Sequence, residues 1–393
     1  TAFLVKTLRG YGYQVLLGRN IIDPDACLGR EMSVVKAGIE RARKNGVSEE
    51  LLAEMQELTG CVAVLDTGRP GPTLALRFDI DCIPVTESTD DKHVPTHCGF
   101  ASKNPGFMHA CGHDAHMSMG LAVCHWLMDN KDKLSGKVKI LFQPAEEGVR
   151  GAAGMAASGI LDDCDYFLSS HVAMLAKSGE LATNLYGFLC TTKYDVTFNG
   201  RASHAGVSPQ EGRNALAAAA NATVQMLGIS RHGGGMTRIN IGQLVAGEGR
   251  NVIPSKAVMK LEVRGETMEI NNYMSEQVTN IVEGIAKGFS VTYDMRKMGE
   301  AVDLTADQEL IDILNESGRE VGLKVLDKPL NFGGSEDATI LARRVQAHGG
   351  KAAFFVWGSD RPSGHHSALF DIQEKDMAPA FDLWTHVLPK ILK

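Results

Sequence analysis

The chain has 393 residues, of which 44% are hydrophobic and 22% charged, and its formal net charge at pH 7 is −7. This length exceeds what one hydrophobic core usually supports, so we expect two domains. The acidic balance argues against a nucleic-acid partner, because few phosphates could be neutralised. No apolar run reaches the roughly 18 residues of a membrane-spanning helix, so we expect no membrane partner.

The amino-terminal region is expected to carry surface helices. Residues 1–10 predict a helix that starts without a cap, so we expect missing residues upstream, and 13–17 predict a short strand. Residues 31–58 are charged and predict two solvated helices; the insertion 20–58 is a plausible docking surface for a partner. Strands are expected at 62–65 and 74–78, joined through a Gly- and Pro-rich hairpin or loop at 68–72.

Further along the chain, helices at 117–128 and 152–159 alternate with strands at 138–142 and 166–170. This alternation predicts an α/β fold with a mostly parallel sheet flanked by helices. Chemistry in such sheets gathers at the carboxyl ends of the strands. Three polar clusters fall at such ends: Asp79 with Asp81, Glu146 with Glu147, and His171.

Residues 189–300 have a different pattern, with strands at 191–198, 238–245 and 257–264 and helices at 214–227 and 268–289. This β-α-β-β-α-β-like order predicts an inserted α+β sandwich. We therefore expect a catalytic domain in two parts, 1–188 and 301–393, with the inserted domain at 189–300. Eight cysteines scattered without paired spacing indicate a reducing compartment and a cytoplasmic protein without a leader.

The octet His109–His116 concentrates one thiol, three imidazoles and one carboxylate around Gly112. A turn at Gly112 can direct Cys111 and His113 at one point. Thiolate and imidazole together suit Zn²⁺, Ni²⁺ or Co²⁺ better than Mg²⁺ or Ca²⁺. By itself the octet is also compatible with a structural zinc site or with an ordinary helix start.

Other donors are weak signals individually. Glu146 and Glu147 could be an acidic helix start, and His171 or the pair His365–His366 could be structural. Together with the octet, however, they give a thiol, at least three imidazoles and two carboxylates at loop positions of one expected sheet. That inventory is typical of a two-metal hydrolase with a free carboxylate that deprotonates water.

Six motifs in chain order resemble those of the M20 metallopeptidases, in particular their amidohydrolase branch. They cover essentially the whole chain: 109–114, 143–148, 203–206, 251–254, 334–337 and His366. The stretches 65–72, 99–102, 353–358 and 364–366 further resemble p-aminobenzoyl-glutamate hydrolases. The resemblance implies a zinc-exopeptidase-like catalytic domain whose inserted domain serves in dimerisation or as a lid.

The resemblance also implies roles for individual residues. Cys111, His113, Glu147, His171 and His366 would bind two divalent ions per subunit, Zn²⁺ or Mn²⁺ with Ni²⁺ and Co²⁺ as alternatives, and Cys111 would bridge them. Glu146 would be the general base that takes a proton from the attacking water and returns it to the leaving amine. Asp114 would orient His113 through the second ring nitrogen. His365 is left as a neighbour of the ligand set.

Three residues of the inserted domain take roles only through the resemblance. His204 would reach across a dimer to stabilise the oxyanion, and Asn251 with Arg264 would hold a substrate carboxylate. Without the resemblance, His204 is a loop histidine and Arg264 a surface arginine. The family's wider His-x-Asp pattern is replaced here by Asp79-Ile80-Asp81, so we expect Asp81 to support a ligand and neither aspartate to bind metal.

The expected activity is metal-dependent hydrolysis of an N-acyl or N-aroyl amino acid, with p-aminobenzoyl-glutamate as the leading substrate. The alternatives are a hydrolase of another N-acyl amino acid such as hippurate, a peptidase, or a subunit that is active only with a second chain. A homodimer or a heterodimer with a related subunit is expected.

Overall fold

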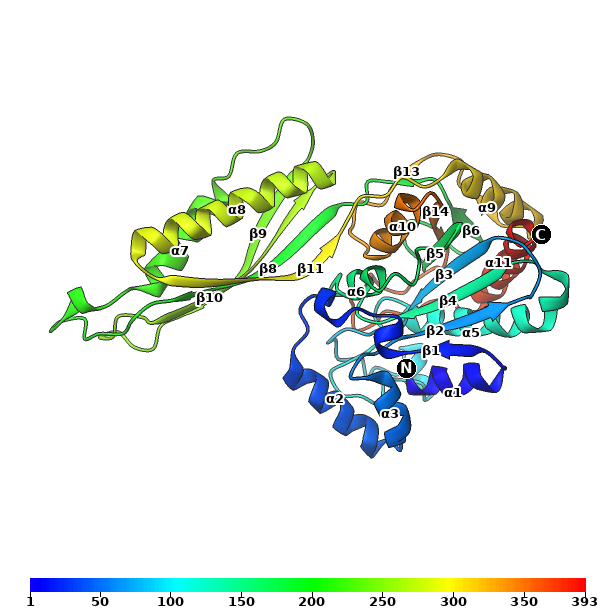
Figure 1. Ribbon diagram of the computed structural model, residues 1–393, viewed down its shortest axis with the longest axis horizontal. Helices are drawn as coiled ribbons and strands as arrows, with labels where there is room; N and C mark the ends of the chain where they lie inside the picture. Colours follow the sequence, from blue (N-terminus) through cyan, green and yellow to red (C-terminus); the bar gives the residue numbers. More distant parts are fainter. The chain divides into compact units, whose positions relative to one another are not determined.

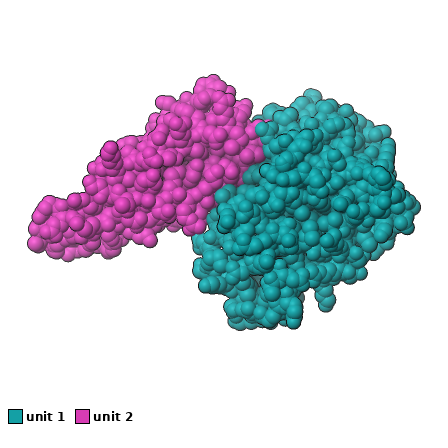
Figure 2. Space-filling view, viewed as in Figure 1, with its two compact units in different colours: residues 1–186, 304–332, 337–393 teal, residues 187–303, 333–336 magenta.

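The computed structural model describes residues 1–393, which form two compact units. Unit 1 comprises 1–186, 304–332 and 337–393, and unit 2 comprises 187–303 and 333–336 (Figure 2). The expected boundaries at 188/189 and 300/301 lie within three residues of these. The short return of residues 333–336 to unit 2 had no signal in the sequence.

Unit 1 is built around an eight-stranded sheet in the order β1-β2-β4-β3-β5-β14-β6-β12 (Figure 1). In that order the strands are β1 (Gln14–Leu16), β2 (Cys61–Asp66), β4 (Lys137–Gln143), β3 (Thr73–Asp79), β5 (Tyr166–Val172), β14 (Lys351–Trp357), β6 (Glu180–Ala182) and β12 (Lys324–Val325). The central strands β4, β3, β5 and β14 are parallel. A separate parallel pair joins β7 (Leu185–Tyr186) to β13 (Leu330–Asn331).

Helices cover both faces of this sheet. One face carries α1 (Ala2–Gly10), α5 (His113–Asn130), α9 (Gln308–Glu320) and α11 (Met377–Ile391), and the other carries α6 (Gly151–Ala157) and α10 (Ala338–Ala347). The central strands are buried along nearly their whole length, as expected for strands covered on both sides. The expected α/β architecture is thus confirmed.

The hairpin alternative for residues 62–78 is wrong and the loop alternative is right. Strand β4 lies between β2 and β3, antiparallel to the first and parallel to the second. The Gly- and Pro-rich segment therefore connects two strands that are not neighbours. Turn residues show where a chain bends, whereas the pairing of β2 and β3 with a strand some 60 residues later is a long-range choice.

The insertion forms two helices with no buried residue, α2 (Met32–Lys44) and α3 (Glu49–Met55), as its charge pattern predicts. The one-turn helix α4 is Val94–His97, and short 3-10 turns lie at Gly18–Asn20, Pro24–Ala26, Lys131–Lys133, Pro209–Glu211 and Glu374–Asp376. No helix is both long enough and apolar enough to cross a membrane.

Unit 2 is a four-stranded antiparallel sheet in the order β11-β8-β10-β9 with two helices packed on it (Figure 1). Its elements in chain order are β8 (Cys190–Asn199), α7 (Ala215–Leu227), β9 (Thr237–Ala246), β10 (Lys256–Gly265), α8 (Met268–Phe289) and β11 (Thr292–Ala301). The alternating strands bury one side against the helices. The sequence predicts the first five elements of this β-α-β-β-α-β order, and the structure adds the final strand β11.

Candidate metal centre and active site

The carboxyl ends of the three adjacent parallel strands β4, β3 and β5 bring the polar clusters together. Asp79 ends β3, Glu146 and Glu147 follow β4, and His171 is the penultimate residue of β5. Helix α5 begins at His113 beside these ends, and the loop after β14 brings His365 and His366 to the same place. The strand-end placement expected from the sequence is therefore what the fold provides.

Gly112 makes the turn that directs Cys111 and His113 at one point. Its φ of 87° lies in the left-handed region, which glycine adopts without strain. A Cβ atom at this position would come within 2.4 Å of Val172 Cγ1 on β5. Glycine therefore allows both the turn and the close approach of the start of α5 to the end of β5.

Cys111, His113 and His171 form one potential ligand set, with one donor atom from each within 4.8 Å of the others. All three side chains are buried. Cys111 Sγ lies 3.5 Å from His171 Nε2. His171 Nδ1 bonds to the Val172 carbonyl at 2.9 Å, so Nε2 is left unprotonated toward the sulfur. Burial lowers the pKa of His171 well below its ordinary value, which keeps the ring neutral and able to bind a metal.

Cys111, Glu147 and His366 form a second set with donor atoms within 4.8 Å of one another. His366 Nε2 lies 3.1 Å from Glu147 Oε2. Hydrogen bonds with Cys111 and Glu147 raise the pKa of His366 to about 10. His366 also adopts a φ of 63°, the kind of left-handed backbone that is retained at functional sites. Cys111 is common to both sets, and a thiolate sulfur can bridge two ions.

His113 provides a further test of whether a metal fits here. Its Nδ1 bonds to Asp81 Oδ1 at 3.2 Å, whereas its Nε2 is buried with no hydrogen-bond partner. A buried ring nitrogen without a partner is rare unless a metal ion or a water molecule binds it. The donor set of thiolate, imidazole and carboxylate fits divalent metal ions such as Zn²⁺.

Asp81, and not Asp114, is the residue that bonds to the second ring nitrogen of His113. Asp114 is exposed in the first turn of α5, because neighbouring helical residues point about 100° apart. The expected role of Asp114 is therefore wrong, and Asp81 takes its place. The other oxygen of Asp81 accepts a hydrogen bond from the backbone N–H of Glu147 at 3.0 Å. One carboxylate thus contacts members of both ligand sets.

Glu146 belongs to neither of the two potential ligand sets that contain Cys111. Ala145, before it, has a φ of 59°, which turns the chain sharply after β4. Glu146 is 7% exposed, and its Oε2 lies 3.8 Å from His113 Nε2. The adjacent Glu147 faces His366 instead. Glu146 thus lies toward His113 and Glu147 toward His366, and one atom each of His113, Glu146 and Glu147 lie within 4.8 Å of one another.

His365 is also close to the centre, with its Nδ1 3.4 Å from Cys111 Sγ. Burial, together with the charges of Arg361 and His366, lowers the pKa of His365 to about 3. Its ring lies against Phe370 with centroids 4.9 Å apart. His365 is thus a neutral neighbour of the sulfur, and the carboxylate pairing distinguishes His366 from it.

Sequence reasoning missed a buried polar layer beneath the ligands. Arg77 is fully buried and bonds to Asp79 at 2.7 Å, to Gln143 at 2.8 Å and to Asp337 at 3.1 Å. His116 Nδ1 bonds to Asp79 Oδ1 at 2.5 Å. The available signal was an arginine inside an otherwise apolar strand, which is seldom buried without partners.

Of the three expected residues of unit 2, two lie together and the third does not. His204 pairs with Val252, and the Ala205 N–H donates to the Asn251 carbonyl, so His204 and Asn251 are neighbours. Arg264 is near the other end of β10, which over eight residues spans roughly 26 Å. One carboxylate therefore cannot contact Asn251 and Arg264 of the same chain.

The orientations of His204 and Arg264 are well defined. Gly206 and Val207 N–H groups both donate to His204 Nδ1 at 3.1 Å, which leaves the proton on the exposed Nε2. His204 can thus donate a hydrogen bond outward. Arg264 is bonded through Nε and Nη2 to Glu262, at 3.0 and 3.3 Å, so that Nη1 is the part of its fork not engaged by Glu262.

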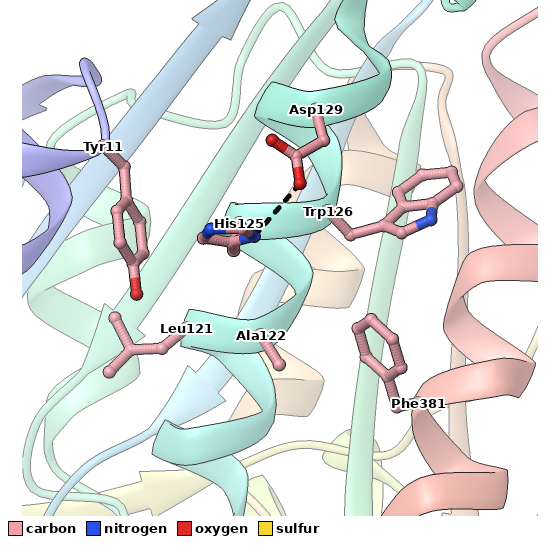
Figure 3. A pocket seen from close by; sticks show the side chains of 7 residues that line it. All are labelled: Tyr11, Leu121, Ala122, His125, Trp126, Asp129 and Phe381. Atoms are coloured by element: carbon pink, nitrogen blue, oxygen red, sulfur yellow. Dashed lines mark ion pairs between the residues drawn. The ribbon is translucent and has the colours of Figure 1, made fainter.

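A separate pocket of about 480 Å³ lies along the later turns of α5 (Figure 3). The side chains of Tyr11, Trp126 and Phe381 line it, and His125 forms an ion pair with Asp129 at 3.2 Å there. None of its lining residues is a member of the ligand sets. The candidate metal centre lies at the first turn of the same helix and is a different site.

The model of the peptidase family M20/M25/M40 matches residues 75–390. The chain belongs to this family. It is 52% identical over 97% of its length to a p-aminobenzoyl-glutamate hydrolase subunit homologue of Haemophilus influenzae, covering 90% of that protein. It is 42% identical to the indole-3-acetyl-aspartic acid hydrolase of Enterobacter agglomerans, over 96% of this chain and 88% of that one. The corresponding subunit of p-aminobenzoyl-glutamate hydrolase from Escherichia coli is 39% identical, with 97% and 89% covered.

Solved structures agree with this assignment. An aminobenzoyl-glutamate utilization protein from Klebsiella pneumoniae matches with a TM-score of 0.83 and 36% identity, covering 99% of this chain and 89% of that one. A Bacillus subtilis protein described as a dinuclear metal binding peptidase of the M20 family has the same fold, with a TM-score of 0.65 and 21% identity over 99% and 97% of the two chains. The chain is therefore a hydrolase of the M20 class, as its motifs predict.

Proposed function

We propose that this protein hydrolyses the amide bond between an aromatic acyl group and an acidic amino acid, with p-aminobenzoyl-glutamate as the leading substrate. The relatives named for p-aminobenzoyl-glutamate and the one named for indole-3-acetyl-aspartic acid share this chemistry, since each name joins an aromatic acid to a dicarboxylic amino acid. Hydrolysis of p-aminobenzoyl-glutamate would yield p-aminobenzoate and glutamate.

The observation that carries the proposal is the sharing of Cys111 between two ligand sets. We assign Cys111, His113 and His171 to one divalent ion and Cys111, Glu147 and His366 to the other, with Zn²⁺ or Mn²⁺ as the leading candidates and Ni²⁺ or Co²⁺ as alternatives. When bound, such ions would polarise the scissile carbonyl and lower the pKa of the attacking water.

Glu146 acts as the general base in this proposal. It is nearly buried beside His113 but is not part of either thiolate-containing set. Its carboxylate takes a proton from the attacking water and then delivers that proton to the leaving amine nitrogen. Asp81 holds His113 and the Glu147 backbone, so that the ligands stay fixed while the proton moves.

We further propose that two copies complete each active site. His204 would donate its Nε2–H to the oxyanion, and Asn251 beside it would contact the substrate from the same copy. Arg264 at the same site would come from the other copy and would hold a substrate carboxylate. Within one chain Arg264 is roughly 26 Å along β10 from the Asn251 end, too far for both to contact one carboxylate. This arrangement gives Asn251 and Arg264 the common substrate that they cannot share within one chain.

The edge of unit 2 is suited to such pairing. Strand β9 is an edge strand of 10 residues, and a long exposed edge is a template for association. Exposed apolar side chains lie on its helix-facing side and on the neighbouring helix α7, with Leu244 40%, Val224 72% and Leu227 54% exposed. We assign this face to the dimer contact, and the partner is a second copy or a related chain.

The eight free cysteines favour a reducing, cytoplasmic location.

The first test is a comparison of Glu146→Gln with Glu147→Gln. Glu146→Gln is expected to keep both metal ions and to lose at least about 100-fold in kcat, as for loss of a general base. Glu147→Gln, the matched control one residue away, is expected to lose metal as well as activity. Metal analysis of each purified variant with turnover of p-aminobenzoyl-glutamate separates the two roles, and unchanged turnover in Glu146→Gln would refute the assignment.

A second test addresses the paired copies. Glu146→Gln and His204→Ala are each expected to be nearly inactive alone. Mixed dimers should regain activity, because one of their two sites combines an intact Glu146 with an intact His204. No recovery on mixing, in samples shown to exchange protomers, would contradict the shared site.

This proposal has two alternatives: hydrolysis of another N-acyl amino acid or a peptide, and activity only together with a second chain. A panel of p-aminobenzoyl-glutamate, indole-3-acetyl-aspartate, hippurate and a dipeptide, each with added Zn²⁺ or Mn²⁺, distinguishes acyl-group preferences. Because two relatives are named as one subunit of a hydrolase, the chain could require a second, related chain. Rapid hydrolysis by the purified chain alone would exclude that requirement.

A further inference from the structure

We propose that the Asp79–His116 pair is a positioning device for one half of the metal centre, the set Cys111, His113 and His171. This inference rests on the proposed two-metal site. It assigns to Asp79 and His116 no contact with substrate and no metal ion of their own. Their effect is exerted through the two imidazoles that they hold.

The contacts of His116 define its role. Its Nδ1 lies 2.5 Å from Asp79 Oδ1, and its Nε2 accepts a hydrogen bond from the backbone N–H of Val172 at 2.9 Å. Val172 directly follows the ligand His171 on β5. The His116 ring also packs edge-on against the His171 ring, with centroids 4.6 Å apart. His116 therefore fixes both the backbone and the ring plane of His171.

The same pair also confines His113. Its ring stacks on His116 with centroids 5.5 Å apart and an interplanar angle of 23°. Asp79 Oδ2 lies 3.7 Å from His113 Nε2. Because Asp81 holds the other nitrogen of His113, the ring is bounded on three sides by fixed groups.

Asp79, His113 and His116 are close enough to resemble a third metal site, with donor atoms within 4.8 Å. The hydrogen bonds exclude that role. Both nitrogens of His116 are already engaged, one with Asp79 and one with the Val172 N–H. Asp79 Oδ2 is bonded to the buried Arg77 at 2.7 Å. A carboxylate and imidazole with these partners form a hydrogen-bonded layer behind the ligands.

The arrangement is selective for one ligand set. Glu147 and His366 are held by a different group of contacts: Asp81 accepts from the Glu147 backbone, and Glu147 faces His366. Asp79 and His116 contact the rings of the first set. Loss of the Asp79–His116 pair should thus weaken the binding of one metal ion and leave the binding of the second unchanged.

The experiment is a Zn²⁺ titration of metal-free protein by calorimetry and competition with a chelator. Asp79→Asn and His116→Ala are each expected to lower the Zn²⁺ affinity of one of the two sites by about 10- to 100-fold. This is the usual effect of removing a residue that supports a metal ligand. The other site should keep its affinity. His116→Gln should recover part of the loss, because its amide oxygen can accept the Val172 N–H.

Two sets of reference variants identify the affected site and exclude a general loss of stability. The double variant Asp79→Asn with His366→Ala should bind neither ion tightly. The double variant Asp79→Asn with His171→Ala should have the same Zn²⁺ affinities as His171→Ala alone. Tyr13→Phe removes a buried hydrogen bond from the tyrosine to the Cys124 carbonyl of α5, at 2.7 Å, without touching a ligand. It should lower the melting temperature and leave both Zn²⁺ affinities unchanged.

Two outcomes would overturn the inference. In the first, Asp79→Asn and His116→Ala bind two Zn²⁺ ions with wild-type affinities. In the second, both sites weaken together, or Tyr13→Phe weakens them equally. If the wild-type protein itself fails to bind two ions, the two-metal proposal fails instead, so the two failures are distinguishable.

Discussion

Replacing Gly112 with alanine tests how far the metal centre depends on a single close contact between α5 and β5. The substitution adds one methyl group at a φ of 87°, with its carbon 2.4 Å from Val172 Cγ1. Both the backbone conformation and the contact then become unfavourable. The strain falls on the turn between Cys111 and His113 and on the residue after His171.

The size of the effect follows from these two terms. A left-handed backbone at a non-glycine residue costs roughly 1–2 kcal/mol. Overpacking a filled interior costs roughly 1–3 kcal/mol more. The expected loss in the free energy of unfolding is therefore about 2–5 kcal/mol, out of about 5–15 kcal/mol for a typical protein. The variant should fold, with a lower melting temperature and weaker metal binding.

Gly349→Ala is a matched control for this measurement. Gly349 has a φ of 90° with no atom within 4 Å of an added Cβ, and it follows α10. It should lose only the backbone term of about 1–2 kcal/mol and keep its metal. Denaturant unfolding of the metal-free proteins gives the free energies, and Zn²⁺ titration gives the affinities.

A double variant isolates the contact with Val172. Val172→Ala removes the clashing Cγ1, so Gly112→Ala with Val172→Ala should be less destabilised than the sum of the two single variants. Equal stability and equal Zn²⁺ affinity of Gly112→Ala and Gly349→Ala would refute the reasoning. In that case the contact of Gly112 with β5 would have no energetic role.

Three further results are expected. Cys111→Ser should weaken the binding of both metal ions, since the sulfur belongs to both sets. His171→Ala and His366→Ala should each weaken the binding of one ion, and analysis of the bound metal distinguishes these outcomes. Chelation should abolish turnover and lower the melting temperature, with recovery on adding Zn²⁺ or Mn²⁺, because ligand at 100 times its Kd stabilises by about 2.7 kcal/mol. Leu244→Lys on β9 should shift the protein toward monomer in sedimentation analysis, and an unchanged dimer would contradict the assigned face.

The sequence predicted those parts of the fold that depend on local periodicity. The alternating strands and helices of both units, and a turn at Gly112, could be inferred from residues close together in the chain. The pairing of β4 between β2 and β3 could not, because turn residues do not specify which strands become neighbours. The return of residues 333–336 to unit 2 likewise depends on tertiary packing.

For the site, residue type and strand-end position predicted which potential ligands gather, but not how they are supported. Asp114 was the obvious partner of His113 by proximity in sequence, yet its helical position turns it outward and Asp81 takes its place. Arg77 and His116 were missed because their partners are distant in the chain. Supporting contacts of this kind depend on side-chain directions in three dimensions.

The two aspartates of the Asp79-Ile80-Asp81 segment explain why a cysteine-containing centre is compatible with this sheet. Asp79 ends β3 facing the buried layer, where Arg77 and His116 occupy its two oxygens. Asp81 lies beyond the strand and reaches His113 and the Glu147 backbone. With both carboxylates engaged in support, neither is free to bridge two ions, and Cys111 is the donor common to both sets. In the proposed two-metal centre, Cys111 is therefore assigned as the bridging donor, because both aspartates already have other partners.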